Sequence, residues 1–329
     1  MRLVLAIMMN HCAPLRVAVV GAGQFGRNHL RVVRESSVAE LAGVYDIDGA
    51  RCAAASAEFG CPAFQSLKEC AAAAHAAIVA APTSAHAETA SFLLRHGLHV
   101  LVEKPIAPDA GSARALISAA REAGRILQVG HLERFNPAVA AARRVLTLPL
   151  FFEIHRLNVF SPRSLDVDVV LDLMIHDIDL VLWLTGAMPE EIRAAGISVL
   201  SPKVDIANVR LAFASGCVAN LTASRISTER VRKLRLFQPH EYISVDYARQ
   251  DALRLSVNQA FQIGGGMLPV EKGEPLRLQF EGFVRSIRTG EPPCVTGEDA
   301  LRTLQVALAI LDKIEEHAQV VSRTLQSAG

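Results

Sequence analysis

Long apolar runs, paired cysteines and an excess of basic residues are all missing from this sequence. Lys and Arg number 34 and Asp and Glu number 33, which leaves a formal net charge of +1. This balance lacks the basic excess that holds nucleic acid and the polybasic run that binds a membrane surface. Aromatic residues make up 5% of the chain and are scattered, which argues against a base-stacking surface. We therefore expect neither a nucleic-acid nor a membrane partner.

The cysteines lack the spacing of a metal site. No two of them form a Cys-x-x-Cys pair, and no histidine pair has zinc-finger spacing, so we expect no metal. A chain of 329 residues, half of them hydrophobic, can bury a core without disulfides. Scattered cysteines in such a chain indicate reduced thiols and a cytoplasmic protein. They are Cys12, Cys52, Cys61, Cys70, Cys217 and Cys294.

Residues 1–13 precede the first predicted strand, and we interpret them as an N-terminal extension. The apolar run 3–9 after Arg2 faintly resembles a signal peptide. It is too short for a membrane helix, and no small-residue cleavage site follows it.

Residues 14–134 alternate short apolar runs with helical stretches. Repeated β-α units with nearly continuous apolar strands imply a parallel sheet covered on both faces, and hence an N-terminal Rossmann domain. The predicted strands are 15–20, 40–45, 76–81, 100–103 and 126–130, and the predicted helices are 24–35, 49–59, 86–96 and 109–123, the last of them capped by Asp109.

The pattern changes near Phe135. Grouped strands flanked by helices indicate that residues 135–329 form an α+β domain with a large open, mainly antiparallel sheet, which makes the chain an α/β protein. The glycine run 264–266 resembles a mobile loop. The predicted strands are 151–160, 191–200, 207–213, 217–225, 231–237 and 241–246, and the predicted helices are 137–146, 167–184, 276–289 and 297–319. We expect Gly186 to end the second of these helices.

A glycine-rich motif follows the first predicted strand and opens the first predicted helix. Gly21 allows a tight turn, Gly23 lets the backbone approach a pyrophosphate, and Gly26 lets the helix pack closely on the strand. Amide groups at the helix start then offer donors and a positive dipole end to phosphates. The predicted cofactor-binding residues of this motif are Gly21, Gly23, Gln24, Phe25 and Gly26.

Asp46 lies at the end of the second predicted strand, twenty residues after Gly26. A carboxylate at this position accepts hydrogen bonds from the 2′- and 3′-hydroxyls of a ribose. It also repels a 2′-phosphate, and the nearest following arginine, Arg51, is five residues on. The predicted cofactor is therefore NAD rather than NADP.

Polar residues follow the predicted strand 76–81, and the carboxyl ends of strands in such a sheet face the ligand crevice. We expect Pro82, Thr83 and His86 to contact the cofactor. Alternatively, Thr83 only caps the next helix, and the two roles are compatible.

Glu103-Lys104-Pro105 ends the next strand at the same edge. Low-dielectric walls and a cationic nicotinamide would depress the pKa of Lys104. The amine would then hydrogen-bond a substrate hydroxyl and stabilise the alkoxide as a hydride leaves. We place Glu103 and Lys104 at the cofactor and Lys104 also at the substrate. The alternative is a structural Lys–Glu pair.

Asp172 and His176 lie on a predicted helix of the second domain. The i, i+4 spacing puts both on one face, with Asp179 one turn further. Asp172 would orient His176, whose neutral imidazole is a suitable base and substrate contact near pH 7. The alternative is a histidine capped by an aspartate within packed helices.

Two arginines are candidates for anion binding. Arg134, in the stretch between the domains, is predicted to contact the cofactor diphosphate or to lock the domain junction. Arg163, in a loop before the helix that carries Asp172, is a candidate substrate phosphate ligand or a solvated charge.

These motifs together resemble the glucose–fructose oxidoreductase/inositol dehydrogenase/MocA family. The resemblance runs from about Leu15 to the C-terminus. It implies a Rossmann domain followed by a domain whose open sheet often packs on another subunit, hence a homodimer or homotetramer. It also implies that Lys104, Asp172 and His176 face the nicotinamide and that the Lys104–Pro105 bond is cis.

The stretches 130–137 and 161–179 resemble one branch of that family, which oxidises the C3 hydroxyl of UDP-N-acetylglucosamine with NAD. That resemblance implies a 3-keto UDP-sugar product and a pyridoxal-phosphate aminotransferase partner that makes a 3-amino sugar for lipid A. The residues on either side of Asp172, at 170–171 and 173–174, are bulkier than in the commoner family pattern. Alternatives are another sugar, inositol or UDP-hexuronate dehydrogenase, and a non-catalytic NAD-binding regulator.

Overall fold

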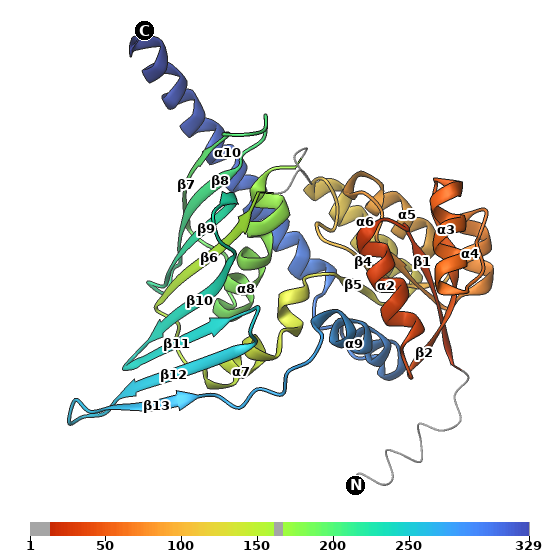
Figure 1. Cartoon of the computed structure of the whole chain (residues 1–329), viewed down its shortest axis with the longest axis horizontal. Coiled ribbons are helices and arrows are strands. Elements are labelled where there is room, and N and C mark those ends of the chain that lie inside the picture. Colours follow the sequence, from red (N-terminus) through yellow and green to blue (C-terminus); the bar gives the residue numbers. More distant parts are fainter. Residues whose placement is uncertain (1–13, 161–166, 329) are drawn as a thin grey trace. The chain divides into compact units, whose positions relative to one another are not determined.

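The computed structural model describes residues 14–160 and 167–328, which cluster into two units. The first unit comprises residues up to Gly130 together with 279–297, and the second comprises 131–278 and 298–329. Figure 1 shows the helices and strands of both units.

The first unit contains a five-stranded parallel sheet, as predicted. Its strand order is β2-β1-β3-β4-β5, in which the crossovers are helical. Val17, Val19, Ile78 and Leu101 are fully buried because both faces of the sheet are covered. The strands are β1 (Leu15–Val20), β2 (Ala39–Tyr45), β3 (Ala76–Val79), β4 (His99–Val102) and β5 (Leu127–Val129).

Short polar side chains start several helices of this unit. Asp48 accepts hydrogen bonds from the amides of Ala50 and Arg51, and Asp109 accepts one from Ser112, the cap expected from the sequence. The helix at 67–73 was not predicted. The helices are α2 (Gln24–Arg34), α3 (Gly49–Phe59), α4 (Leu67–Ala73), α5 (Thr83–Arg95) and α6 (Ala110–Ala123), with most of α9 (Pro275–Thr289).

The unit boundaries differ from the single division predicted after residue 134. Residues 131–134 belong to the second unit, and 279–297 return to the first. The returning segment is bonded to β5, since the Gln128 side chain donates to the Gln279 carbonyl and the Val129 amide donates to the Val295 carbonyl. Sequence periodicity detects a helix at α9 but carries no information on which sheet the helix joins.

The second unit contains an eight-stranded open sheet of order β13-β12-β11-β10-β6-β9-β8-β7. Its pairs are antiparallel except β6 with β9, so the sheet is mainly antiparallel, as predicted. Strands β12 and β13 were not predicted. Strand β13 includes the glycines 264–266, which were expected to form a loop and which pair with β12. The strands are β6 (Phe151–Val159), β7 (Glu191–Ile197), β8 (Ile206–Ala212), β9 (Val218–Ser227), β10 (Val231–Gln238), β11 (Glu241–Asp246), β12 (Asp251–Val257) and β13 (Ile263–Met267).

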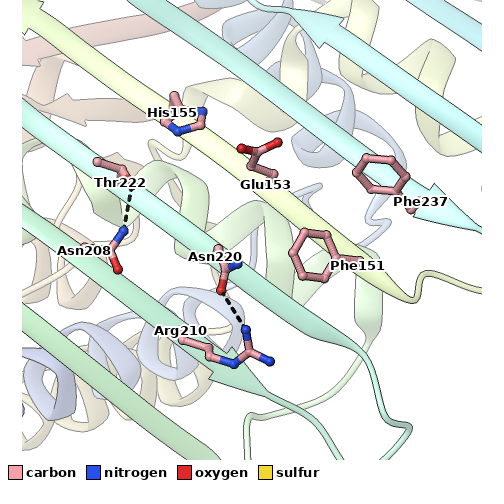
Figure 2. Close-up of a pocket in the computed structure, with 8 residues that line it drawn as sticks. All are labelled: Phe151, Glu153, His155, Asn208, Arg210, Asn220, Thr222 and Phe237. Carbon is pink, nitrogen blue, oxygen red and sulfur yellow. Dashed lines mark hydrogen bonds between the residues drawn. The ribbon is translucent and has the colours of Figure 1, made fainter.

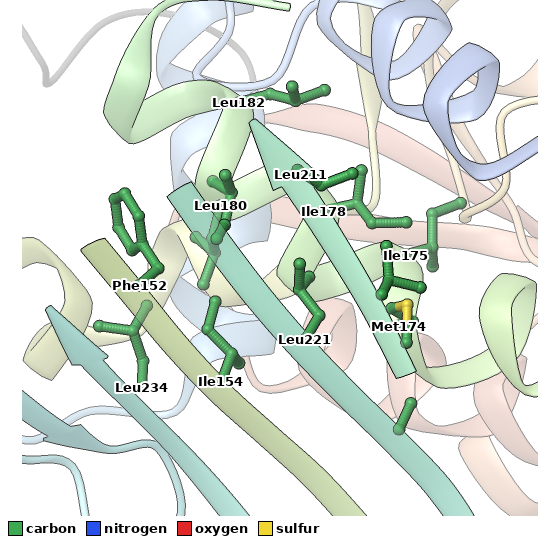
Figure 3. Close-up of a cluster of buried hydrophobic side chains, with 14 of the residues drawn as sticks. Phe152, Ile154, Met174, Ile175, Ile178, Leu180, Leu182, Leu211, Leu221 and Leu234 are labelled. Atoms are coloured by element: carbon green, nitrogen blue, oxygen red, sulfur yellow. The ribbon is translucent and has the colours of Figure 1, made fainter. Parts of the chain in front are cut away.

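Helices cover one face of this sheet (Figure 1). Figure 3 shows the core between them, which includes Phe152 and Leu221 of the sheet and Met174 and Ile178 of the helical segment, all essentially buried. Gly186, at φ 67°, ends that segment, as predicted. The helices are η1 (Leu132–Phe135), α7 (Pro137–Val145), η2 (Val170–Met174), α8 (Ile175–Thr185) and α10 (Gly297–Ala328).

The other face of the sheet carries a shallow cavity of about 740 Å³. Figure 2 shows its mixed lining, in which Asn208 donates to Thr222 and Arg210 donates to Asn220. Phe151 and Phe237 lie edge to face there, with ring centroids 5.9 Å apart. This outer face is polar and aromatic, unlike the aliphatic inner face.

Candidate active site

The glycine motif forms the turn from β1 into α2, with each glycine in its predicted place. Gly21 has φ +97°, a conformation that side chains disfavour, and a Cβ there would lie 2.6 Å from the Ala80 carbonyl oxygen. A Cβ on Gly26 would lie 1.8 Å from the Gly21 oxygen. No atom lies within 4 Å of a Cβ built on Gly23, so the backbone there faces open space. This geometry fits close approach of a pyrophosphate.

The carboxylate of Asp46 links this turn to the end of β2. It accepts a hydrogen bond from the Ala22 amide at 2.7 Å and another from the Asp48 amide at 2.9 Å. The Arg51 guanidinium lies 3.7 Å from it. Each carboxylate oxygen has a further lone pair, so the residue can still accept from a ribose.

A cavity of about 550 Å³ opens beside the turn. Its lining includes five predicted cofactor residues: Gly21, Gly23, Gln24, Phe25 and Asp46; Pro82 is a sixth. The rest of the wall was not predicted, because side chains such as those of Ile47, Leu67 and Phe92 belong to no motif. Ile47 is 92% exposed on this wall, so its side chain is free to contact a ligand.

Thr83 and His86 are not part of that lining. Pro82 is the N-cap of α5 and no side chain caps the helix, so the capping role expected of Thr83 is wrong. His86 is buried, with its two ring nitrogens 2.8 Å from the carbonyl oxygens of Ala81 and Pro105. It therefore joins the segments that follow β3 and β4. Cofactor contact by Thr83 and His86 stays a prediction.

Glu103 and Lys104 follow β4, and the Lys104–Pro105 peptide is cis, as the family resemblance implied. The buried His29 of α2 contacts the Glu103 carboxylate at 2.8 Å, and the Lys104 amide donates to its other oxygen at 3.3 Å. Gly130 leaves room for this carboxylate, since a Cβ there would lie 2.7 Å away. The Glu103 side chain is therefore anchored by the helix that the glycine motif opens.

In the second unit, Asp172 lies in a π-helical turn and His176 follows at the start of α8. Single π-helical turns occur frequently at functional sites. The π turn alters the regular α-helical rotation assumed for the predicted shared face. The His176 ring packs nearly perpendicular to that of His131, with centroids 6.4 Å apart.

The two other aspartates of α8 are buried in ion pairs. Asp177 forms a two-point pair with Arg156, at 2.7 and 2.8 Å, and Arg156 also donates to Glu133 at 3.0 Å. Arg134 forms the same kind of pair with Asp179. Asp179 therefore serves as the partner of Arg134 within this unit and does not extend the predicted face of Asp172 and His176.

Arg134 is 4% exposed and donates to Asp299 as well as to Asp179. Its guanidinium is thus held by carboxylates of its own unit. The expected diphosphate contact by Arg134 stays a prediction. Arg163 lies outside the described residues.

Within residues 14–160 and 167–328, no group of three or more histidine, cysteine or acidic side chains is arranged to hold a metal ion. Over the same described stretches, no helix is both long and apolar enough to span a membrane.

The sequence matches two family descriptions, one for each unit. Residues 15–131 match "Oxidoreductase family, NAD-binding Rossmann fold", and residues 151–238 match "GFO/IDH/MocA C-terminal domain".

Relatives of the whole chain agree with these matches. UDP-N-acetylglucosamine 3-dehydrogenase from Acidithiobacillus ferrooxidans is 35% identical, over 93% of this chain and 99% of that protein. A solved structure of that enzyme has a TM-score of 0.88 over 93% of this chain and 99% of its own. Inositol 2-dehydrogenase from Rhizobium meliloti is 24% identical, over 93% and 98%.

The aldose-aldose oxidoreductase from Caulobacter crescentus has the same fold, with a TM-score of 0.82 at 21% identity over 92% of this chain and 98% of its own. Both units thus match one family, and the similarity to a named dehydrogenase extends along nearly the whole chain. The protein is a dehydrogenase that belongs to the GFO/IDH/MocA oxidoreductase family, and its first unit is the NAD-binding domain of that family.

Proposed function

We propose that the protein oxidises the C3 hydroxyl of UDP-N-acetylglucosamine to a ketone, with NAD as oxidant. The observation that carries the substrate assignment is the 35% identity along 99% of an enzyme named for that reaction. The glycine turn, Asp46 and the adjoining cavity support the cofactor assignment.

The first unit would hold the cofactor through its backbone at Gly21–Gly26 and through the Asp46 carboxylate. Amides at the start of α2 would donate to the diphosphate, and Asp46 would accept from the adenosine ribose. When bound, NAD supplies the hydride acceptor. The negative charge of Asp46 disfavours the 2′-phosphate of NADP, which is the basis for the assignment to NAD.

Proton removal from the 3-hydroxyl would fall to His176 and Lys104. In the assignment we adopt, the His176 imidazole takes the proton, Asp172 orients the ring, and the Lys104 ammonium polarises the oxygen. The reverse assignment, with neutral Lys104 as the base, uses the same groups. The two residues would then titrate as one coupled pair.

A 3-keto sugar nucleotide is a substrate for transamination. We therefore propose that a pyridoxal-phosphate aminotransferase consumes the product, to give a 3-amino sugar for lipid A. The pairing would also draw an unfavourable oxidation forward by removing the ketone.

Absorbance of NADH during turnover tests the substrate. The panel should include UDP-N-acetylglucosamine, a UDP-hexuronate, myo-inositol and glucose, each with and without an aminotransferase and its amino donor. Of these four compounds, we expect only UDP-N-acetylglucosamine to be turned over. Faster turnover of another member would assign a different dehydrogenase activity, and no turnover with normal NAD binding would indicate a regulator.

Substitution tests the proton-handling groups. Lys104→Met and His176→Ala should each lower kcat by about 100-fold or more, since general acid–base groups contribute about 10²–10⁴-fold. NAD affinity, followed by calorimetry, should change little. A near-normal rate in either variant would refute the role assigned to that residue.

A further inference from the structure

The inner face of the second sheet ends in polar residues where β6 finishes and β10 begins. Even-numbered residues of β10 point to the helix-covered side, where Leu234 and Leu236 are 2% and 3% exposed. Arg232 belongs to the same series and pairs across the strands with Arg156. The Arg232 side chain therefore projects from the inner face of the sheet, two residues before the buried Leu234.

Arg156 donates hydrogen bonds to the carboxylates of Asp177 and Glu133. Its two-point bond to Asp177 uses both oxygens of that aspartate. Glu133 accepts from Arg156 with one oxygen and from Asn136 with the other. The nearby carboxylates thus have their hydrogen bonds with other residues.

Arg232 makes no such bond. Its Nε is buried and has no hydrogen-bond partner within the described part of the chain. Burial, together with repulsion by Arg156 and Arg230, lowers the pKa of Arg232 to about 10. Attraction to Glu133 and Asp177 offsets this only in part, and both carboxylates accept hydrogen bonds from Arg156 instead.

A second polar group next to it is also unsatisfied. Asn158 follows Arg156 by two residues on β6 and so lies on the same inner face, just past the Leu157–Val231 pair. Its Oδ1 is buried and has no hydrogen-bond partner among the described residues. An amide that rotates by half a turn presents its NH₂ group instead, so Asn158 can donate as well as accept.

We propose that Arg232, assisted by Asn158, binds a phosphate of the nucleotide part of the substrate. The inference rests on the proposed function, which makes the substrate a nucleoside diphosphate sugar. A guanidinium presents paired N–H donors that match two phosphate oxygens, and charge-assisted bonds of this kind are the strong ones. A phosphate would also supply the hydrogen-bond acceptor that Arg232 Nε lacks among the described residues.

The test uses full-length protein saturated with NAD, with UDP and inorganic pyrophosphate as probes in calorimetry. Arg232→Gln should weaken both probes by about 10- to 100-fold, the range for loss of a charge-assisted bond. The KM for UDP-N-acetylglucosamine should rise equally while kcat stays within about threefold, because the phosphate is remote from C3. Arg232→Lys should lie between, since it keeps the charge but loses the paired donors.

Arg193→Gln is the matched control, because it removes an exposed guanidinium from β7 of the same sheet. It should bind both probes like the wild type. Equal affinity for UDP in the Arg232→Gln protein and this control would overturn the proposal.

The two proposals fail separately. If the wild type does not oxidise UDP-N-acetylglucosamine but binds UDP through Arg232, the anion subsite stands and the proposed function fails. If the wild type oxidises that substrate and Arg232→Gln changes neither KM nor UDP affinity, the function stands and the subsite fails.

Discussion

Asp46 combines two roles in one carboxylate. Its hydrogen bond from the Ala22 amide holds the glycine turn against β2, and its charge sets the cofactor preference we propose. Replacement by alanine would remove both effects together. Asparagine separates them, since its amide oxygen can still accept from Ala22.

Asp46→Asn should therefore keep the turn but lose discrimination between cofactors. We expect the ratio of kcat/KM for NAD to that for NADP to fall about 10-fold, an effect of the size of one charged hydrogen bond. Initial rates with each cofactor measure this ratio. Arg114→Gln on the exposed face of α6 serves as the control, and an unchanged ratio in Asp46→Asn would contradict the role assigned to the charge.

At this scale, the sequence predicts correctly the local geometry of the turn, whereas the cofactor roles of its residues stay predictions. Gly21, Gly26 and Asp46 follow from the turn between β1 and α2, which the motif specifies completely. Arg134 behaves differently because its partners come from distant segments. Arg134 meets Asp179, 45 residues away, and no spacing rule anticipates such a pair.

At the scale of elements, α8 shows how one helix serves several purposes. Its apolar residues fill the core of the second unit, its Asp177 and Asp179 are paired with arginines, and the π-helical turn before it carries Asp172. The sequence predicts the helix and its end at Gly186. It does not predict the π turn, because hydrophobic periodicity over so few residues cannot distinguish i+4 from i+5 bonding.

The start of β4 depends on an uncharged histidine. His99 Nδ1 accepts a hydrogen bond from the Ile126 amide at 3.0 Å, which only an unprotonated nitrogen can do. Burial, with repulsion by Arg125, lowers the pKa of His99 from 6.5 to about 4. Between these values the unfolded chain binds a proton that the folded chain excludes.

The free energy of unfolding should therefore decrease as pH falls from about 6.5 towards 4, and this contribution is fully present above about 6.5. Urea unfolding at a series of pH values measures the slope. His99→Asn keeps an acceptor but does not titrate, so its profile should be flatter than that of the wild type. Parallel profiles for the two proteins would rule out His99 as a source of the acid sensitivity.

At the scale of the molecule, the outer face of the eight-stranded sheet is where we propose that a second copy packs. Phe237 is 38% exposed there, next to Phe151 and Tyr242. Arg235 and Glu153 form an ion pair on the same face. This face therefore carries both positive and negative charge and can pack against the same face of a second copy.

Phe237→Asp should shift the protein from dimer or tetramer towards monomer, because it buries a charge in the proposed interface. Light scattering after gel filtration gives the mass directly. Arg114→Glu, in the first unit, should leave the mass unchanged. A wild type that is monomeric at micromolar concentration would exclude the interface outright.

The return of residues 279–297 to the first unit has a consequence for synthesis of the chain. Strand β5 emerges early, yet its partners Gln279 and Val295 are made about 150 residues later. During translation, residues 131–278 of the second unit are therefore synthesised before the segment that bonds to β5. Both units are thus discontinuous in sequence, since 279–297 completes the first and 298–329 completes the second, and a fragment that ends at residue 134 lacks the segment bonded to β5.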